Sequence, residues 1–350
     1  MIIAGSGPTD RDGNSPALPG ANNSLKLLAE ALAARGIASV RYDKRGVGET
    51  GKAMLAAVAK TKTILREEDL SFENYIDDAV RWGKQLRADR RFSALTVLGH
   101  SEGSLIGMVA AQRISADAFI SVAGAGRPIR QIILEQVTAQ MSPELLKKTE
   151  EILEQLSAGK QVAAPPSELN ALFRPSIQPY MISWLRYEPG KEIGKLRIPI
   201  LIVQGTTDLQ TRLEDSTSLA NSNPAAKLLL IEGMNHVLKT VPNDRDRQVS
   251  SYSDPTLPVT PALIIALTEF VDKGKCDECG RGRTTSSHPT SRQSKRNPTR
   301  WIASKFSSSA NSSLISERRK VGVEQLEVAL TCIQPSSLVN ERQADSAPVE

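Results

Sequence analysis

Short apolar runs alternate with amphipathic stretches along the first 273 residues of the chain. Leu25, Leu28 and Leu32 recur at helical spacing, and apolar residues recur in the same way between Phe72 and Leu86. The apolar runs between these stretches are short, so we predict strands at Met1 to Ala4, Ala38 to Tyr42, Leu95 to Leu98, Ala118 to Val122, Ile198 to Val203 and Lys227 to Ile231. Strands that alternate with helices favour an α/β fold with a mostly parallel central sheet flanked by helices.

One segment, residues 127–195, interrupts this alternation. It contains two helical patterns around Pro165 and Pro166 but no run typical of a strand. We interpret it as a helical cap inserted into a core made of residues 1–126 and 196–273, and an ordinary long crossover between strands is the alternative. A final helix from about Pro261 to Val271 is expected to close the sheet, since proline suits the first helical turn.

The character of the chain changes after residue 273. Residues 274–350 are rich in serine, threonine and arginine and have little apolar periodicity, so we expect a disordered tail. A Cys276–Cys279 pair lies in this tail, and it is followed only by His288 and Cys332 at irregular spacing. Because zinc sites need a second close pair of ligands, we predict no metal site there.

The formal net charge of +5 is concentrated in the tail. From Lys275 onward the chain has twelve lysines and arginines and eight acidic residues, which leaves +1 for everything before it. A nearly neutral body argues against a nucleic-acid partner. No apolar run approaches the roughly 20 residues that cross a bilayer, no export signal is recognisable, and the three cysteines lie late in the chain, so we expect a cytoplasmic protein without a membrane partner.

The strongest local motif is Gly-His-Ser-Glu-Gly at residues 99–103. A strand-like run precedes it and a helix-like stretch follows it, which is the context of a nucleophile elbow. In such a turn the serine occupies strained backbone, and side chains two residues to either side would collide, so both positions are glycine. The turn presents Ser101 as a nucleophile and directs backbone N–H groups at a developing oxyanion. His100 is expected only to pack beside the site.

A serine hydroxyl needs a base to take its proton, and histidine suits that role at neutral pH. Of the three histidines, one adjoins the serine and one lies in the tail, which leaves His236, on a loop after a predicted strand, as the general base. The carboxylate that orients it should follow the preceding strand, and Asp208 is the first one there. Glu214 and Asp215 are rivals, but we expect them on the solvated face of a helix.

An oxyanion hole needs two N–H donors. The first candidate is Glu102, which follows the nucleophile. The second is Ser6 in the loop Gly-Ser-Gly-Pro at residues 5–8, since glycines let backbone approach a ligand closely, and a plain tight turn is the alternative for this loop. The loop lacks both the Lys-Ser/Thr of a P-loop and the third glycine of a dinucleotide fingerprint, so it does not predict a nucleotide site.

Five motifs, taken together, resemble those of bacterial α/β-hydrolase esterases related to the serine-aminopeptidase-like branch. They are Gly-Ser-Gly-Pro-Thr-Asp-Arg-Asp-Gly-Asn at residues 5–14, Arg-Tyr-Asp-Lys-Arg-Gly-Val-Gly at 41–48, the elbow, Gln-Gly-Thr-Thr-Asp at 204–208 and Gly-Met-Asn-His at 233–236. The resemblance spans roughly residues 1–271. It implies hydrolysis of small-molecule carboxylesters with short acyl groups through an acyl-enzyme, and no metal or organic cofactor. It also implies that Asp43 and residues 45–48 shape a loop beside the oxyanion strand, which is the strand predicted at Met1 to Ala4, rather than take part in catalysis.

The chain departs from the family's pattern at both ends. Members have further strands before the oxyanion strand, so we expect that the first strands are missing here, in which case an export signal could be missing with them. The tail after residue 274 matches nothing in the family.

Other activities fit the same triad. A hydrolase of short peptides or an acyltransferase would use the same residues, and an inactive hydrolase-like relic is the alternative outside catalysis. The predicted cap also has apolar side chains that need a surface to face, so we expect it to cover the pocket and set the acyl length. These side chains belong to Phe173, Tyr180, Met181, Trp184 and Leu185.

Overall fold

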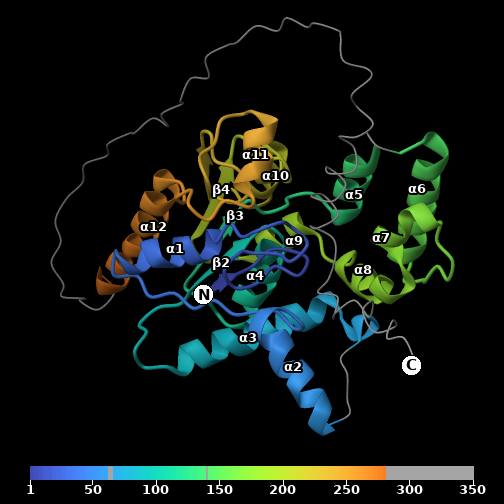
Figure 1. The fold of residues 1–350 in the computed structure, drawn as a ribbon. Coiled ribbons are helices and arrows are strands. Elements are labelled where there is room, and N and C mark those ends of the chain that lie inside the picture. Colours follow the sequence, from blue (N-terminus) through green and yellow to red (C-terminus); the bar gives the residue numbers. More distant parts are fainter. Residues whose placement is uncertain (62–65, 139–140, 281–350) are drawn as a thin grey trace, which may run out of the picture.

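The computed structural model describes residues 1–61, 66–138 and 141–280 (Figure 1). Within them, one sheet is formed in which every neighbouring pair of strands is parallel. The spatial order follows the chain: β1 (Ile2–Ile3), β2 (Thr96–His100), β3 (Ala118–Val122), β4 (Ile200–Gly205) and β5 (Lys227–Ile231). The predicted fold class, a mostly parallel sheet flanked by helices, is confirmed.

The run at residues 38–42, which we predicted as a strand, is not one. Only an isolated parallel bridge joins Arg41 to Ile2, next to a hydrogen bond of 2.8 Å from the Ile2 amide to the Val40 carbonyl. Its partner β1 has two residues, so no longer ladder forms. β4 begins two residues later than predicted because Pro199 has no amide hydrogen to donate to a ladder.

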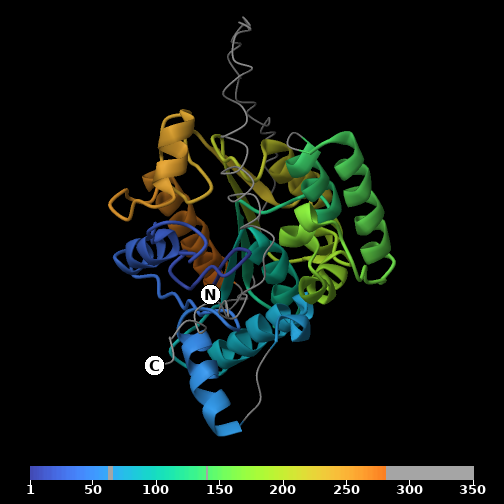
Figure 2. The same ribbon diagram turned by 45° about the vertical axis from the view of Figure 1, so that its right-hand side comes forward.

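Helices cover both faces of the sheet (Figure 2). They are α1 (Ser24–Ala33) and α12 (Pro261–Gly280) on one face, and α3 (Phe72–Ala88), α4 (Glu102–Arg113), α9 (Pro189–Lys195) and α10 (Leu213–Ser222) on the other. Ile2 and Leu98 face α1 and α12, whereas Ile3 and Val97, their neighbours along the strands, face α3 and α4. Both faces of β1 and β2 are therefore apolar, as in other parallel sheets with helices on either side.

Residues 127–195 form helices and turns, and no strand lies among the described residues of this segment. Its elements before α9 are α5 (Ile129–Thr138), α6 (Pro143–Ser157), η2 (Ser167–Leu169), α7 (Asn170–Phe173), η3 (Pro175–Ile177) and α8 (Gln178–Trp184), which lie together beside the core (Figure 1). Trp184 of α8 stacks on Phe72 of α3 with ring centroids 5.7 Å apart, and Tyr180 meets Tyr75 edge-on at 5.7 Å. The apolar side chains of this segment and those of α3 and α4 belong to one hydrophobic cluster.

The last helix is longer than predicted. We expected a helix to about Val271 and a disordered tail from residue 274, but α12 continues to Gly280. The rest of the predicted tail, residues 281–350, lies outside the described residues. The remaining helices and turns of the described part are α2 (Gly48–Thr61), η1 (Glu67–Asp69) and α11 (Arg245–Ser251). Within that part, no helix combines the length and apolar character needed to cross a membrane.

The expectation that Asp215 lies on a solvated helix face is wrong, because this carboxylate is completely buried. It accepts hydrogen bonds from the amides of Gly126, at 3.0 Å, and Arg127, at 3.2 Å, and it forms an ion pair of 2.9 Å with the Arg127 guanidinium. It also accepts a bond of 3.0 Å from the amide of Arg212, the residue just before α10. Asp215 thus joins the start of the segment 127–195 to the helix after β4. Its neighbour Glu214 is exposed, as expected.

We expect Asp215→Ala to lower the free energy of unfolding by about 3–5 kcal/mol, since it removes the acceptor of three backbone amides and leaves the partly buried Arg127 guanidinium with Glu135 as its remaining partner. The matched variant Glu214→Ala, one residue away and exposed, should change it by no more than about 0.5 kcal/mol. Urea denaturation of the two variants and the wild type measures the difference. Equal stability of the two variants would contradict the role assigned to Asp215.

Candidate active site

Ser101 lies in the sharp turn between β2 and α4, with φ of 55° and ψ of −125°. Neighbouring backbone leaves no room for side chains on either side of it. A Cβ on Gly99 would lie 2.1 Å from the carbonyl oxygen of Gly103, and a Cβ on Gly103 would lie 2.5 Å from the carbonyl oxygen of Ala4. The amide of Ser101 donates to the carbonyl of Val122, at 3.0 Å, which ties the turn to β3. The two glycines of the motif therefore have the steric role that its spacing predicts.

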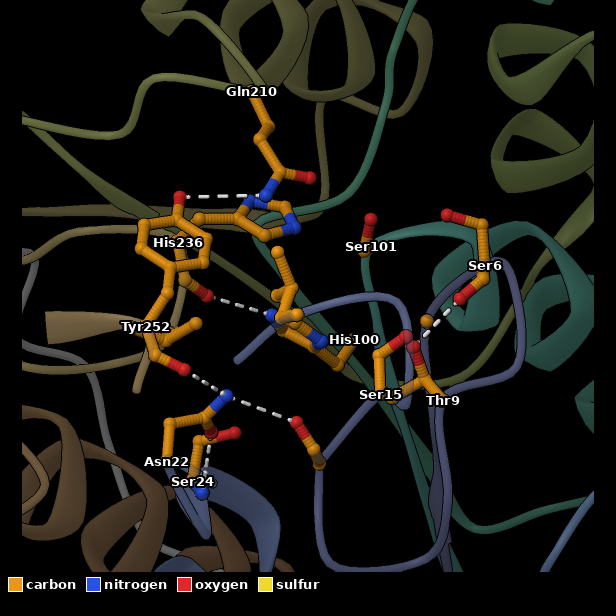
Figure 3. Close-up of a pocket in the computed structure, with 14 residues that line it drawn as sticks. Ser6, Thr9, Ser15, Asn22, Ser24, His100, Ser101, Gln210, His236 and Tyr252 are labelled. Carbon is orange, nitrogen blue, oxygen red and sulfur yellow. Dashed lines mark hydrogen bonds between the residues drawn. The ribbon is translucent and has the colours of Figure 1, made fainter. Parts of the chain in front are cut away.

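The structure brings His236 and Asp208 together from two different loops. Asp208 follows β4 and His236 follows β5, and Nδ1 of His236 lies 2.9 Å and 3.1 Å from the two carboxylate oxygens. Both side chains are buried. When Nδ1 carries the proton and donates it to Asp208, Nε2 is left as an acceptor. The imidazole points toward Ser101 (Figure 3), so this nitrogen faces the hydroxyl that the predicted mechanism deprotonates.

Asp208 has several hydrogen-bond partners in addition to His236. One oxygen accepts from the amides of Gln210, at 2.8 Å, and Thr211, at 3.0 Å, and the other accepts from the Thr211 hydroxyl at 2.9 Å and from Gln204 at 3.2 Å. Burial alone would raise the pKa of this carboxyl group, but the charge and hydrogen bond of His236 and these donors outweigh it and hold the pKa below its usual value. The carboxylate of Asp208 is therefore ionised in the folded protein at neutral pH.

Gln204 and Thr211 were not identified from the sequence. Gln204 carries a weak signal, since it is a polar residue at the end of an otherwise apolar run, and it is completely buried. Thr211 has no signal of its own, because only the turn after Asp208 brings its hydroxyl back to the carboxylate.

One predicted oxyanion donor, Glu102, lies within the elbow, and the other, Ser6, lies in a loop beside it. Glu102 is the first residue of α4, and Ser6 lies in the loop that follows β1. This loop approaches the nucleophile closely, since a Cβ on Gly5 would lie 3.1 Å from Cβ of Ser101. Within the described residues we find no hydrogen-bond acceptor for the amide of Ser6 or of Glu102, so both remain available to a ligand.

Ser101 and His236 line one small cavity of about 50 Å³ (Figure 3). Half of its lining residues come from the loop between β1 and α1, and others come from the loops after β4 and β5. The other lining residues are Gly5, Ser6, Thr9, Gly13, Ser15, Leu18, Asn22, Ser24, His100, Gln210, Val237 and Tyr252. Among the described residues of the segment 127–195, none lines it. The expectation that the apolar residues of this segment face the pocket is therefore wrong: Phe173, Tyr180, Met181 and Trp184 are buried in the cluster with α3.

His100 supports the loop that carries His236. Its Nε2 lies 2.8 Å from the carbonyl oxygen of His236, to which it donates a hydrogen bond, and the two rings lie 4.8 Å apart. Burial, together with the neighbouring histidine, lowers the pKa of His100 to about 3. His100 is thus a neutral side chain beneath His236 and not a second base.

Among the described residues, no group of three histidine, cysteine, aspartate or glutamate side chains could hold a metal ion. His288, Cys332 and the side chains of Cys276 and Cys279, which we considered for zinc, lie outside what the structure describes.

Comparison with known proteins agrees with the fold and the elbow. Residues 21–178 match the sequence model of the family described as serine aminopeptidase, S33. Esterase EstD of Thermotoga maritima is 27% identical over 241 residues, which cover 68% of this chain and 54% of that protein. The chain thus spans about half the length of this curated relative.

Solved structures of esterases are also similar. Est1E from Butyrivibrio proteoclasticus with ferulic acid bound has a TM-score of 0.48 at 18% identity, over 79% of this chain and 88% of the other. A thermophilic esterase from Thermogutta terrifontis has a TM-score of 0.43 at 16% identity, over 78% and 89%. The parallel sheet flanked by helices, the turn at Ser101 and the two sequence matches together show that the chain has an α/β-hydrolase fold.

We expect His100 to make the stability of the protein depend on pH below neutrality. Its pKa is about 3 in the folded state and near 6.5 in the unfolded state, so between these values the unfolded chain binds the extra proton. Stability should therefore fall as pH drops from 6.5 toward 3, by up to about 1.4 kcal/mol for each pH unit. The variant His100→Gln keeps an N–H donor for the His236 carbonyl but does not titrate. Urea unfolding at several pH values from 7 to 4.5 should give a shallower slope for this variant, and parallel slopes would show that His100 is protonated in the folded state.

Proposed function

We propose that the chain is a carboxylester hydrolase that acts on short-chain acyl esters through Ser101, His236 and Asp208 and an acyl-enzyme intermediate. The observation that carries the proposal is the hydrogen bond between His236 and Asp208, with the imidazole directed at Ser101 in a shared cavity (Figure 3). A positioned base and its orienting carboxylate are what a serine hydroxyl needs to become a nucleophile. The match to a protein named as an esterase supports an ester as the substrate.

In the proposed reaction, Oγ of Ser101 attacks the ester carbonyl carbon while Nε2 of His236 takes the hydroxyl proton. The π electrons of the carbonyl group move to its oxygen, and the amides of Ser6 and Glu102 stabilise the resulting negative charge. When the C–O bond to the alcohol breaks, the alcohol oxygen takes the proton from His236, and the acyl group stays on Ser101. Water then attacks the acyl-enzyme by the same route and releases the carboxylic acid. Asp208 stabilises the imidazolium that forms in each step.

The size of the cavity supports short acyl groups. About 50 Å³ holds only a few water-sized groups, so a long acyl chain would have to displace the surrounding loops. Leu18 and Val237 are its apolar lining residues, while serine, threonine, asparagine and glutamine supply much of the rest. A small acyl group against these two residues fits this lining better than an extended aliphatic chain.

We expect Ser101→Ala to abolish turnover of p-nitrophenyl acetate, because Ser101 carries the hydroxyl that the imidazole of His236 faces (Figure 3). Asp208→Asn and His236→Ala should each lower kcat by roughly 10⁴-fold, and the effects should not add in combination. The control is Ser93→Ala, an exposed serine outside the site, which should behave as the wild type. Steady-state kinetics on esters and short peptides, with labelling by a fluorophosphonate, measures all four variants. Near wild-type turnover by Ser101→Ala would exclude the mechanism, and faster turnover of peptides than of esters would replace the proposed substrate class.

We expect kcat/KM to decrease steadily from acetyl to octanoyl p-nitrophenyl esters. Leu18→Ala enlarges the cavity and should shift this profile toward longer chains, by at most about fifteenfold for butyryl over acetyl, since the two added methylenes contribute about 0.8 kcal/mol each. Trp184→Phe changes an aromatic residue that packs on Phe72 and does not line the cavity, so it should lower stability and leave the profile unchanged. If Trp184→Phe changed the acyl-length profile and Leu18→Ala did not, the acyl group would bind against the segment 127–195 instead.

A further inference from the structure

A buried lysine lies beneath the loop that carries the second oxyanion donor. Lys44 is 4% exposed, and its ammonium group donates hydrogen bonds to the carbonyl oxygens of Gly5 and Gly7, the latter at 2.7 Å. These two carbonyls belong to the residues on either side of Ser6. Lys44 lies between Asp43 and Arg45, two residues that we expected to shape a loop beside the first strand, and it was not itself singled out from the sequence.

The bond to Gly5 fixes the direction of the Ser6 amide. The carbonyl of Gly5 and the N–H of Ser6 belong to one planar trans peptide group, so they point in opposite directions. Because the carbonyl is turned toward Lys44, the N–H must point away from it. The Gly5–Ser6 peptide also lies close to Ser101, since a Cβ on Gly5 would lie only 3.1 Å from Cβ of Ser101.

The same ammonium group also reaches the residue that supplies the first oxyanion donor. Its Nζ lies 3.9 Å from one carboxylate oxygen of Glu102, whose side chain is equally buried. The other oxygen of Glu102 accepts a hydrogen bond from the hydroxyl of Tyr180 in α8. Lys44 therefore lies between the two backbone segments that carry the candidate donors, and it contacts both of them.

We propose that Lys44 is a positioning residue for the oxyanion hole: it orients the Ser6 amide through the Gly5 carbonyl and sets its distance from the Glu102 amide. This inference rests on the proposed esterase function, because it assigns a device to the same site. Lys44 does not touch the substrate or the reacting atoms. It acts by keeping two N–H groups aimed at one point before the substrate arrives, which is the preorganisation that oxyanion stabilisation requires.

The burial of Lys44 and Glu102 is unfavourable for both charges, which supports a functional role for the cation. Burial lowers the pKa of Lys44 to about 8, although the carboxylate of Glu102 raises it in part. Burial also raises the pKa of Glu102. The protein thus keeps a cation and a carboxyl group out of water at 3.9 Å, where an apolar pair of similar volume would often be equally stable or more so.

A simpler role for Lys44 is to compensate the charge of Glu102, and two variants separate the roles. Lys44→Met removes the donor to Gly5 and Gly7 and leaves Glu102 without its cation. The double variant Lys44→Met with Glu102→Gln removes the donor and the carboxylate charge together, so it avoids an uncompensated buried charge if the single variant fails to fold. Arg174→Met is the control for loss of a partly buried ion pair outside the site, since Arg174 pairs with Glu67.

The measurements are kcat and KM for p-nitrophenyl acetate, the melting temperature, and the inhibition constant of a small trifluoromethyl ketone. This ketone adds Oγ of Ser101 to its carbonyl carbon, and its oxygen then occupies the oxyanion position. Active-site titration with a fluorophosphonate corrects kcat for the fraction of folded enzyme. Loss of one oxyanion donor costs about 10²- to 10³-fold in kcat in other serine hydrolases.

We expect both Lys44 variants to lose about 10²-fold or more in kcat with little change in KM, and the ketone to bind more weakly by a similar factor. The double variant should melt near the wild-type temperature, and Arg174→Met should melt lower with kcat unchanged. Recovery of wild-type kcat in the double variant would overturn the proposal, since Lys44 would then serve only to balance Glu102. A loss of kcat without weaker ketone binding would overturn it too. If the wild type itself turned over no ester while its serine still reacted with the fluorophosphonate, the proposed function would fail rather than this inference.

Discussion

Three stretches of backbone meet at Ser101 with no room for side chains between them: the end of β2, the first turn of α4 and the loop after β1. Gly99 contacts the backbone of Gly103, Gly103 contacts the carbonyl of Ala4, and Gly5 contacts the nucleophile itself. This crowding makes the serine and the two candidate donor amides parts of one rigid unit. It also fixes the edge of the sheet at which chemistry can occur, because β4 and β5 run parallel to β2 and deliver Asp208 and His236 to the same edge.

Where a requirement is local, the sequence predicted it well. The two glycines around the serine follow from steric conflict within five residues, and the strand and helix on either side of them have clear periodicity. Asp208 and His236 could be selected because the carboxyl ends of parallel strands share one edge, so the first suitable side chain after each strand is close to the others. Even the two-residue β1 was located, since its apolar run stops at a glycine-rich loop.

Requirements that depend on distant contacts could not be read from the sequence. Asp215 has the neighbours of a surface helix, and only the return of the chain at Gly126 and Arg127 buries it. Trp184 and Tyr180 have the character of pocket residues, but α3 presents Phe72 and Tyr75 to them and thereby includes them in the core. Lys44 lies in a row of charged residues that gives no sign of which one is buried. In each case a partner more than 80 positions away, or a loop folded back from the start of the chain, decides the outcome.

The hydrogen bond from Tyr180 to Glu102 has a consequence for how this protein can diversify. Insertions between strands are commonly treated as exchangeable modules that vary specificity while the catalytic framework stays constant. Here the segment 127–195 donates the hydroxyl of Tyr180 to Glu102, next to Ser101, and contributes its aromatic residues to the main core. A segment transplanted from another hydrolase would have to bring a donor for this carboxyl group, or the recipient would have to change Glu102 and Lys44 at the same time. A functional exchange of the segment 127–195 therefore has to include residues of the elbow and of the loop around position 44.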